Sequence, residues 1–161
     1  MAKVNPVPAG YHTVTPSLTV SDARAALEFY KKAFGAEEKE LCLDLDGKKV
    51  MHAELKIGDS VIMLNEEFPQ MGCIGPKALG GSPVTLYLYF DDVDARFERA
   101  VNAGAKVTMP LTDMFWGDRF GQVEDPFGHK WSFAMHVADL SPEEIRKGQE
   151  EWAKQQMAHA K

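Results

Sequence analysis

The sequence predicts an α+β domain made of two similar modules, each with the order strand, helix, strand, strand, strand. Residues 11–65 and 84–136 both start with an alternating strand, continue into an amphipathic helix that ends at Gly-Ala, and return to strands. The segment 66–83 between them is rich in glycine and proline, as a linker would be. A helix over about 141–159 follows. Since the chain has 161 residues, we expect one domain with internal repetition.

The first module begins with alternating polar and apolar residues from His12 to Val20, which predict its first strand. Ser21 is expected to cap the following helix, whose apolar residues recur at helical spacing until Gly35 ends it. Three further strands are expected at 38–45, 48–57 and 60–65.

The second module repeats this order. The interval from Asp22 to Gly35 is matched by the interval from Asp92 to Gly104, which is one residue shorter. Before it, alternation from Val84 to Phe90 predicts a strand. The remaining strands are expected at 106–109, about 120–124 and 129–136, with a turn at 125–128.

The C-terminal helix has a clear start signal. Ser141 is placed to cap it, Pro142 suits the first helical position, and Glu144 completes a capping box. The helix is amphipathic, with a few apolar residues among many charged ones. We therefore expect it to pack on its own domain, and the alternative is that it packs on a partner subunit.

Composition excludes several classes of protein. The formal charge is −6 and the basic residues are scattered, so nucleic acid is not expected as a partner. Apolar runs are far shorter than the roughly 20 residues that a membrane span needs, and we expect a cytoplasmic protein with no membrane partner. Cys42 and Cys73 are expected to be reduced thiols, and neither lies beside an obvious activating base in the sequence.

Several catalytic motifs are absent from the sequence. It has no glycine-rich phosphate loop followed by Lys-Ser/Thr, no GxSxG and no HExxH. Phosphoryl transfer, serine hydrolysis and zinc-protease chemistry are therefore not expected.

Three segments resemble one known family. They are TPSLTVSDARAALEFYKKAFGAEE, HAELKIGDSVIML and WGDRFGQVEDPFGHKWSFAMH, and they lie within residues 11–136. They resemble the vicinal oxygen chelate superfamily, which includes glyoxalase I, bleomycin-resistance proteins and dihydroxybiphenyl dioxygenase, and most closely its PhnB-like branch. The resemblance implies a curved mixed sheet around a cavity and a homodimer. It leaves the activity open, because this fold serves lyases, isomerases, dioxygenases and proteins that sequester drugs.

Strand alternation indicates which residues line the cavity. If the more apolar face of each strand packs on the helices, the other face points inward. The inward residues are then Thr13, Thr15, Ser17, His52, Glu54, Thr85, Tyr87, Tyr89, Lys130, Ser132 and Ala134.

The resemblance also places the family's metal ligands. In this sequence their positions align with Thr15, His52 or Glu54, Thr85 and Ser132, which supply at most one or two good ligands. A catalytic metal typically needs about three protein ligands. We therefore expect no cofactor. The alternative is Zn, Ni, Mn or Fe held by His52 and Glu54 and completed by His12, His129 or His136, whereas the simpler interpretation of His52 and Glu54 is a hydrogen-bonded polar pair.

The segment 115–120 is a second candidate site. Trp116 could stack on a planar ligand while Arg119 forms a bidentate contact with an anionic group. Arg119 could instead pair structurally with Asp118, Glu124 or Asp125.

Our leading hypothesis is a metal-free protein that binds a small, partly aromatic or amphipathic molecule between the modules or at a dimer interface. The expected ligand-binding residues are Thr15, His52, Glu54, Thr85, Tyr87, Trp116, Arg119 and Ser132. The second hypothesis is a metal-dependent lyase or isomerase of the glyoxalase I type, or a related dioxygenase. A third is that dimerisation or complex formation is itself the function.

Overall fold

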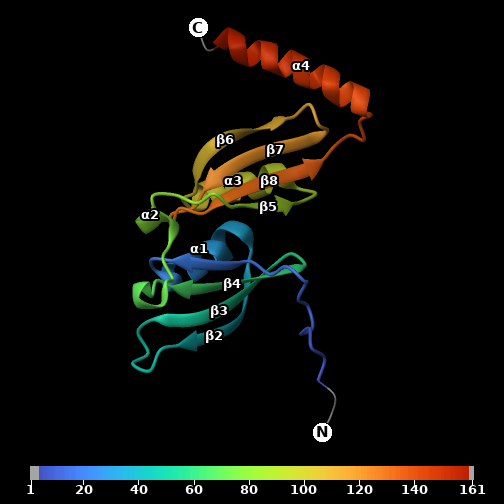
Figure 1. The fold of residues 1–161 in the computed structure, drawn as a ribbon. Helices are drawn as coiled ribbons and strands as arrows, with labels where there is room; N and C mark the ends of the chain where they lie inside the picture. The colour runs from blue at the N-terminus through green and yellow to red at the C-terminus, as the bar shows by residue number, and fades with distance from the viewer. Residues whose placement is uncertain (1–3, 160–161) are drawn as a thin grey trace.

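A computed structural model describes residues 4–159 as two four-stranded sheets with their helices (Figure 1). The first module consists of β1 (Ser17–Val20), α1 (Ala23–Phe34), β2 (Glu37–Leu43), β3 (Val50–Ile57) and β4 (Ser60–Glu66). The linker forms the short helices η1 (Pro69–Met71) and α2 (Pro76–Leu79). The second module consists of β5 (Thr85–Tyr89), α3 (Val93–Ala103), β6 (Lys106–Asp113), β7 (Asp118–Glu124) and β8 (Lys130–His136), and α4 (Pro142–His159) follows. The predicted fold class is confirmed.

The two sheets have the same topology. Their strand orders are β1-β4-β3-β2 and β5-β8-β7-β6. In each sheet the first strand pairs in parallel with the last one, and the other pairs are antiparallel. The helix that follows the first strand lies on one face of its sheet, so the other face is left for a ligand or a partner (Figure 1).

Two helix starts show how local chemistry sets the boundaries. The predicted cap of α1 was wrong by one residue, because Asp22 and not Ser21 accepts a hydrogen bond from the Ala25 amide, at 2.9 Å. The predicted capping box of α4 is confirmed. The Glu144 amide donates to the Ser141 hydroxyl at 3.3 Å, and the Ser141 amide donates to the Glu144 carboxylate at 2.8 Å.

An aromatic core joins the modules where α1 and α3 pack against each other. The Phe34 ring lies 4.5 Å from the Trp131 ring, and both side chains are fully buried. The buried Asp125 carboxylate accepts from the Tyr30 hydroxyl at 2.7 Å and from Trp131 Nε1 at 2.8 Å. Because Tyr30 belongs to the first module and Asp125 to the second, this carboxylate ties the two halves together.

Helix α4 lies apart from the two sheets (Figure 1). It touches its own domain through Trp152, whose ring centre is 5.9 Å from that of Phe115, and through Gly148, which lies so close to Phe115 that a Cβ there would be 2.8 Å from the Phe115 Cβ. The expected packing on its own domain is therefore confined to this contact and leaves most of the helix exposed.

Within residues 4–159, none of the helices combines the length and the apolar character that crossing a bilayer requires.

Candidate functional site

The face of the second sheet that points away from α3 carries four neighbouring aromatic side chains, which we call the aromatic platform: Tyr87, Tyr89, Trp116 and Phe120. The Tyr87 ring centre lies 5.2 Å from that of Tyr89 and 5.5 Å from that of Phe120. Trp116 meets Phe120 edge to face at 5.7 Å. Phe120 forms the buried floor, whereas Tyr87 and Tyr89 are 45% and 62% exposed. The platform thus offers ring faces to a ligand.

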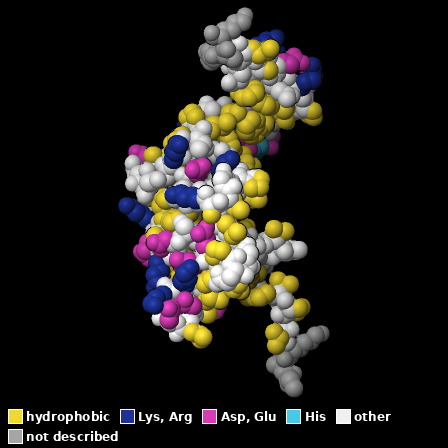
Figure 2. Space-filling model, turned by 60° about the vertical axis from the view of Figure 1, so that its left-hand side comes forward, with side chains coloured by type: hydrophobic (Ala, Val, Ile, Leu, Met, Phe, Trp, Pro, Cys, Tyr) yellow, Lys and Arg dark blue, Asp and Glu magenta, His cyan; other side chains and the backbone are white. Residues whose placement is uncertain are grey.

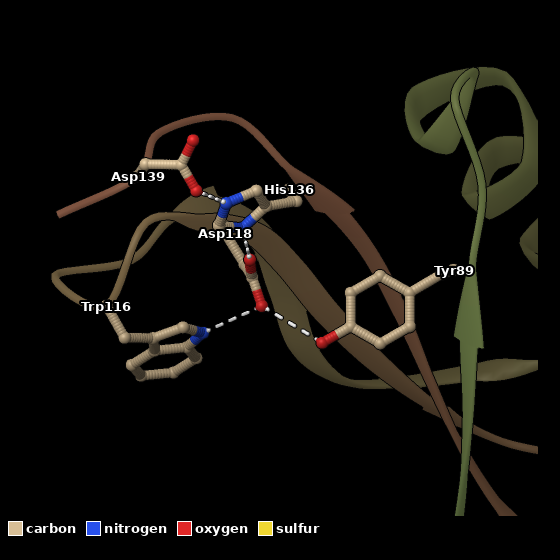
Figure 3. Close-up of polar contacts among 5 residues, drawn as sticks. All are labelled: Tyr89, Trp116, Asp118, His136 and Asp139. Atoms are coloured by element: carbon tan, nitrogen blue, oxygen red, sulfur yellow. Dashed lines mark hydrogen bonds and ion pairs between the residues drawn. The ribbon is translucent and has the colours of Figure 1, made fainter.

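A buried carboxylate fixes the edge of this platform (Figure 3). Asp118 Oδ2 accepts from Trp116 Nε1 at 3.2 Å and from the Tyr89 hydroxyl at 3.3 Å. Asp118 Oδ1 lies 2.8 Å from His136 Nδ1, and the other ring nitrogen of His136 lies 3.0 Å from Asp139 Oδ1. These contacts hold two platform rings in one orientation.

The same contacts set the charge at this edge. Hydrogen bonds to Asp118 and then to Asp139 raise the pKa of His136 above its ordinary value of 6.5. Burial is the largest cause that raises the pKa of Tyr87 to about 12 and also raises the pKa of Tyr89, so both phenols stay neutral. A protonated His136 balances the charge of the Asp118 carboxylate, and the platform presents neutral phenol rings.

A cavity of about 640 Å³ lies between the two modules. It is lined by His12, Val14, Pro16, Ile57, Gly58, Asp59, Ser60, Val61, Ile62, Leu86, Tyr87, Leu88, Tyr89, Phe90 and Trp131. Tyr87 and Tyr89 belong to both the cavity wall and the platform, so the cavity and the platform adjoin at β5.

The first sheet carries a separate polar cluster. His52 Nε2 lies 3.3 Å from Glu54 Oε1. Hydrogen bonding with Tyr11 is the largest cause that lowers the pKa of Glu54, and it raises the pKa of Tyr11 to about 12. A second cavity, of about 610 Å³, lies here, and its lining includes Tyr11, Thr15, Glu40, Glu54 and Met63.

The expected site residues divide between these two regions. Thr85, Tyr87 and Ser132 lie on the platform face of the second sheet, where Ser132 pairs with Tyr87 in register and its hydroxyl is 3.4 Å from Gln122 Nε2. Thr15 and the His52–Glu54 pair lie on the first module. Thr15 precedes β1, and its hydroxyl donates to the His12 carbonyl at 3.1 Å.

The structure does not bring Trp116 and Arg119 together, and the idea that they form one site was wrong. Residues 118 and 119 are neighbours in a strand, so Asp118 points to the platform and Arg119 points to the helix side. Arg119 forms a bidentate pair with Asp94, at 2.6 and 2.8 Å, and a third bond to Asp113 at 3.0 Å. Its partners also differ from the three carboxylates that the sequence suggested.

Sequence reasoning also missed part of the platform. Alternation placed Tyr89 on the cavity face, but nothing in the sequence marked Phe120 as its floor or Asp118 as its anchor. Both depend on the register between β7 and β8, in which Phe120 is opposite Ala134 and Asp118 is opposite His136.

The donor set of the described residues does not fit a three-ligand metal centre. Within residues 4–159, no three side chains of His, Cys, Asp or Glu lie close enough together to hold an ion. His129 is buried with Nε2 at 3.0 Å from the Thr19 carbonyl, and His136 is held by two aspartates. His52 and Glu54 therefore remain a pair without these histidines.

Comparison with known proteins agrees with this fold. The sequence model of the Glyoxalase/Bleomycin resistance protein/Dioxygenase superfamily matches residues 11–133. The chain is 48% identical over 137 residues to the uncharacterized protein Rv0887c of Mycobacterium tuberculosis, which covers 83% of this chain and 79% of the relative.

Two solved structures are similar to the whole two-module body. TioX from Micromonospora sp. ML1 is 27% identical, with a TM-score of 0.63 over 78% of this chain and 99% of that one. The Arabidopsis thaliana protein At5g48480 is 30% identical, with a TM-score of 0.62 over 77% of this chain and 98% of that one.

Proposed function

Because the chain belongs to the glyoxalase, bleomycin resistance protein and dioxygenase superfamily, we propose that it binds a small planar molecule in the cavity between its modules. The observation that carries this proposal is that Tyr87 and Tyr89 both line the 640 Å³ cavity and belong to the aromatic platform. Family membership alone does not select binding over catalysis, because one fold serves both. The aromatic platform, which offers ring faces and no evident reacting group, supports binding.

The residues that line the cavity and the platform indicate the size and polarity of the ligand. Cavities of about 300–1,000 Å³ suit drug-sized molecules. Exposed phenol rings held in place favour stacking with a planar, largely apolar partner. Thr85 is exposed on the same face of β5 as the two tyrosines, and its hydroxyl would hydrogen-bond a polar substituent.

Substitution of the platform tests the proposal. A panel of planar aromatic compounds is screened against the full chain by saturation-transfer NMR, and the hits are measured by calorimetry. Loss of a stacking ring removes about 0.5–1.5 kcal/mol beyond the loss of buried area, so Tyr87→Ala should weaken binding roughly tenfold. Trp116→Ala should weaken it by a similar factor.

Two control variants distinguish loss of a platform ring from the effect of any surface substitution on binding. Arg119→Ala changes the opposite face of the same sheet, and Trp152→Ala removes an exposed tryptophan from α4. Both should bind as the unsubstituted chain does. Unchanged affinity in a folded Tyr87→Ala variant would contradict the proposal.

We further propose that this binding needs no catalytic metal, with a metal-dependent lyase, isomerase or dioxygenase as the alternative. Support comes from the possible metal ligands. Within residues 4–159, His52 and Glu54 lie together without a third His, Cys, Asp or Glu side chain placed to complete a site. Elemental analysis of protein purified without chelators, and again after incubation with zinc, nickel, manganese or ferrous iron, should give well below one metal per chain. Near-stoichiometric metal that disappears in His52→Ala would overturn this proposal.

The three motif segments also support a place in the PhnB-like branch, which we propose on that basis alone.

A further inference from the structure

Four side chains with acidic, basic or nucleophilic groups form a square on β2 and β3. In the register of these strands, Glu40 lies directly opposite Glu54, and Cys42 lies directly opposite His52. Residues two apart in a strand share a face, so all four side chains lie together. Ala53, between His52 and Glu54, points into the buried core, which places the square on the face away from α1.

The imidazole in this square is oriented by a carboxylate. His52 Nε2 is 3.3 Å from Glu54 Oε1, and the depressed pKa of Glu54 keeps that carboxylate ionised at neutral pH. A carboxylate beside one ring nitrogen stabilises the imidazolium that forms when the other nitrogen accepts a proton. The ring is therefore prepared to act as a base through Nδ1.

The thiol is within reach of this base. Directly opposite residues of an antiparallel pair have Cβ atoms about 4.5–5.5 Å apart, which allows a thiol and an imidazole to meet by rotation about χ1. In the structure Cys42 Sγ lies 3.7 Å from the Leu43 carbonyl, a weak contact that such a rotation would release.

Cys42 is also accessible, and a cavity lies beside it. Its side chain is exposed on β2, the edge strand of the first sheet. The 610 Å³ cavity is lined in part by Glu40 and Glu54, the other two corners of the square. The cavity therefore adjoins the square on its Glu40–Glu54 side.

We infer that Cys42 captures electrophilic small molecules covalently, with His52 as the base. His52 takes the thiol proton, and the sulfur adds to the β-carbon of an α,β-unsaturated carbonyl compound. The new S–C bond forms as the C=C π electrons move to the α-carbon, which receives the proton back from His52. The addition is balanced without an oxidant or other co-reactant. It is separate from binding at the aromatic platform.

The flanking charges define the electrophile further. Glu40 and Glu54 both lie on the thiol's face, and like charges repel at this range. The site therefore favours neutral or cationic electrophiles over anionic ones.

Cys73 provides a control within the same molecule, because it is half-buried in the linker, where it bridges to Phe68. The full chain is treated with a limiting amount of N-ethylmaleimide at pH 7, and modification of each cysteine is followed by peptide mass spectrometry. Cys42 should react at least about tenfold faster than Cys73, since a positioned base takes the thiol proton as the sulfur attacks. Equal or slower modification of Cys42 would overturn the inference without any variant.

Exposure alone could also make Cys42 fast, so a second comparison tests the base. His52→Gln should slow modification of Cys42 about tenfold and leave Cys73 unchanged. Thr112→Ala, which removes an exposed hydroxyl from β6 of the other sheet, should change neither rate. If Cys42 in a folded His52→Gln variant reacts as in the unsubstituted chain, its reactivity reflects exposure only and the inference fails.

The charge preference has its own readout. Iodoacetamide and iodoacetate alkylate thiols at the same carbon and differ in charge, so the ratio of their rates at Cys42 reports the local field. Glu40→Gln should raise the relative rate of iodoacetate at Cys42 by roughly threefold. An unchanged ratio would contradict the assignment of these carboxylates to the site.

Discussion

His136 is the residue whose charge state organises the edge of the platform, because its two ring nitrogens reach Asp118 and Asp139. A histidine whose folded pKa is raised contributes stability that is fully present below the unfolded pKa and is lost as pH rises through the folded pKa. The contribution of His136 should therefore be complete below about pH 6.5 and fade above the raised pKa.

NMR titration of the imidazole should give a pKa above 6.5 for His136, and Asp118→Asn should lower it. Unfolding of His136→Gln should differ most from that of the unsubstituted chain at mildly acidic pH and least in alkaline solution. A measured pKa at or below 6.5 would show that the imidazole is not held by these carboxylates.

The residues also show where sequence reasoning stops. Alternation within a strand correctly grouped Thr85, Tyr87 and Tyr89 on one face. It could not reveal that Cys42 faces His52, because that pairing depends on the register between β2 and β3. This register shifts just before Glu40 and again just after Cys42. Neither cysteine has a base beside it in the sequence, and the sheet supplies one from the next strand.

At the scale of elements, the repeat predicted every strand and every long helix, and the two largest boundary errors lie at proline residues. β1 begins at Ser17 and not at His12, since Pro16 has no amide to donate to the sheet. β6 continues to Asp113, beyond the predicted end at Met109, because the ladder with β7 shifts register around Pro110 and then resumes. Pro16 therefore limits β1, whereas β6 continues through Pro110. The local sequence pattern does not show which of these two effects a proline will have.

The whole molecule leaves surfaces that a second copy would cover, and we expect a homodimer. Hydrophobic side chains gather over the second module beside α4 (Figure 2). On the edge strand β6, Val107 and Met109 are 41% and 37% exposed. An edge strand with exposed apolar side chains is a surface on which a second chain can pair.

Light scattering of the purified protein should give twice the 17.9 kDa of one chain. The double substitution Val107→Lys and Met109→Lys should shift it toward a single chain, whereas Glu98→Lys on the exposed surface of α3 should not. A single-chain mass at high micromolar concentration would contradict the expected dimer.

The shared carboxylate of Asp125 has a consequence for how the halves depend on each other. Separated modules would expose Tyr30 on one side and Trp131 on the other, each of which stabilises the fold by about 1.5–3 kcal/mol through burial. Asp125 would also lose the Tyr30 hydroxyl, the donor that reaches it from the first module. The contact between the modules, and not the peptide that links them, is therefore what makes the chain one folding unit. Cleavage in the segment 66–83 should leave two fragments that stay associated and unfold together.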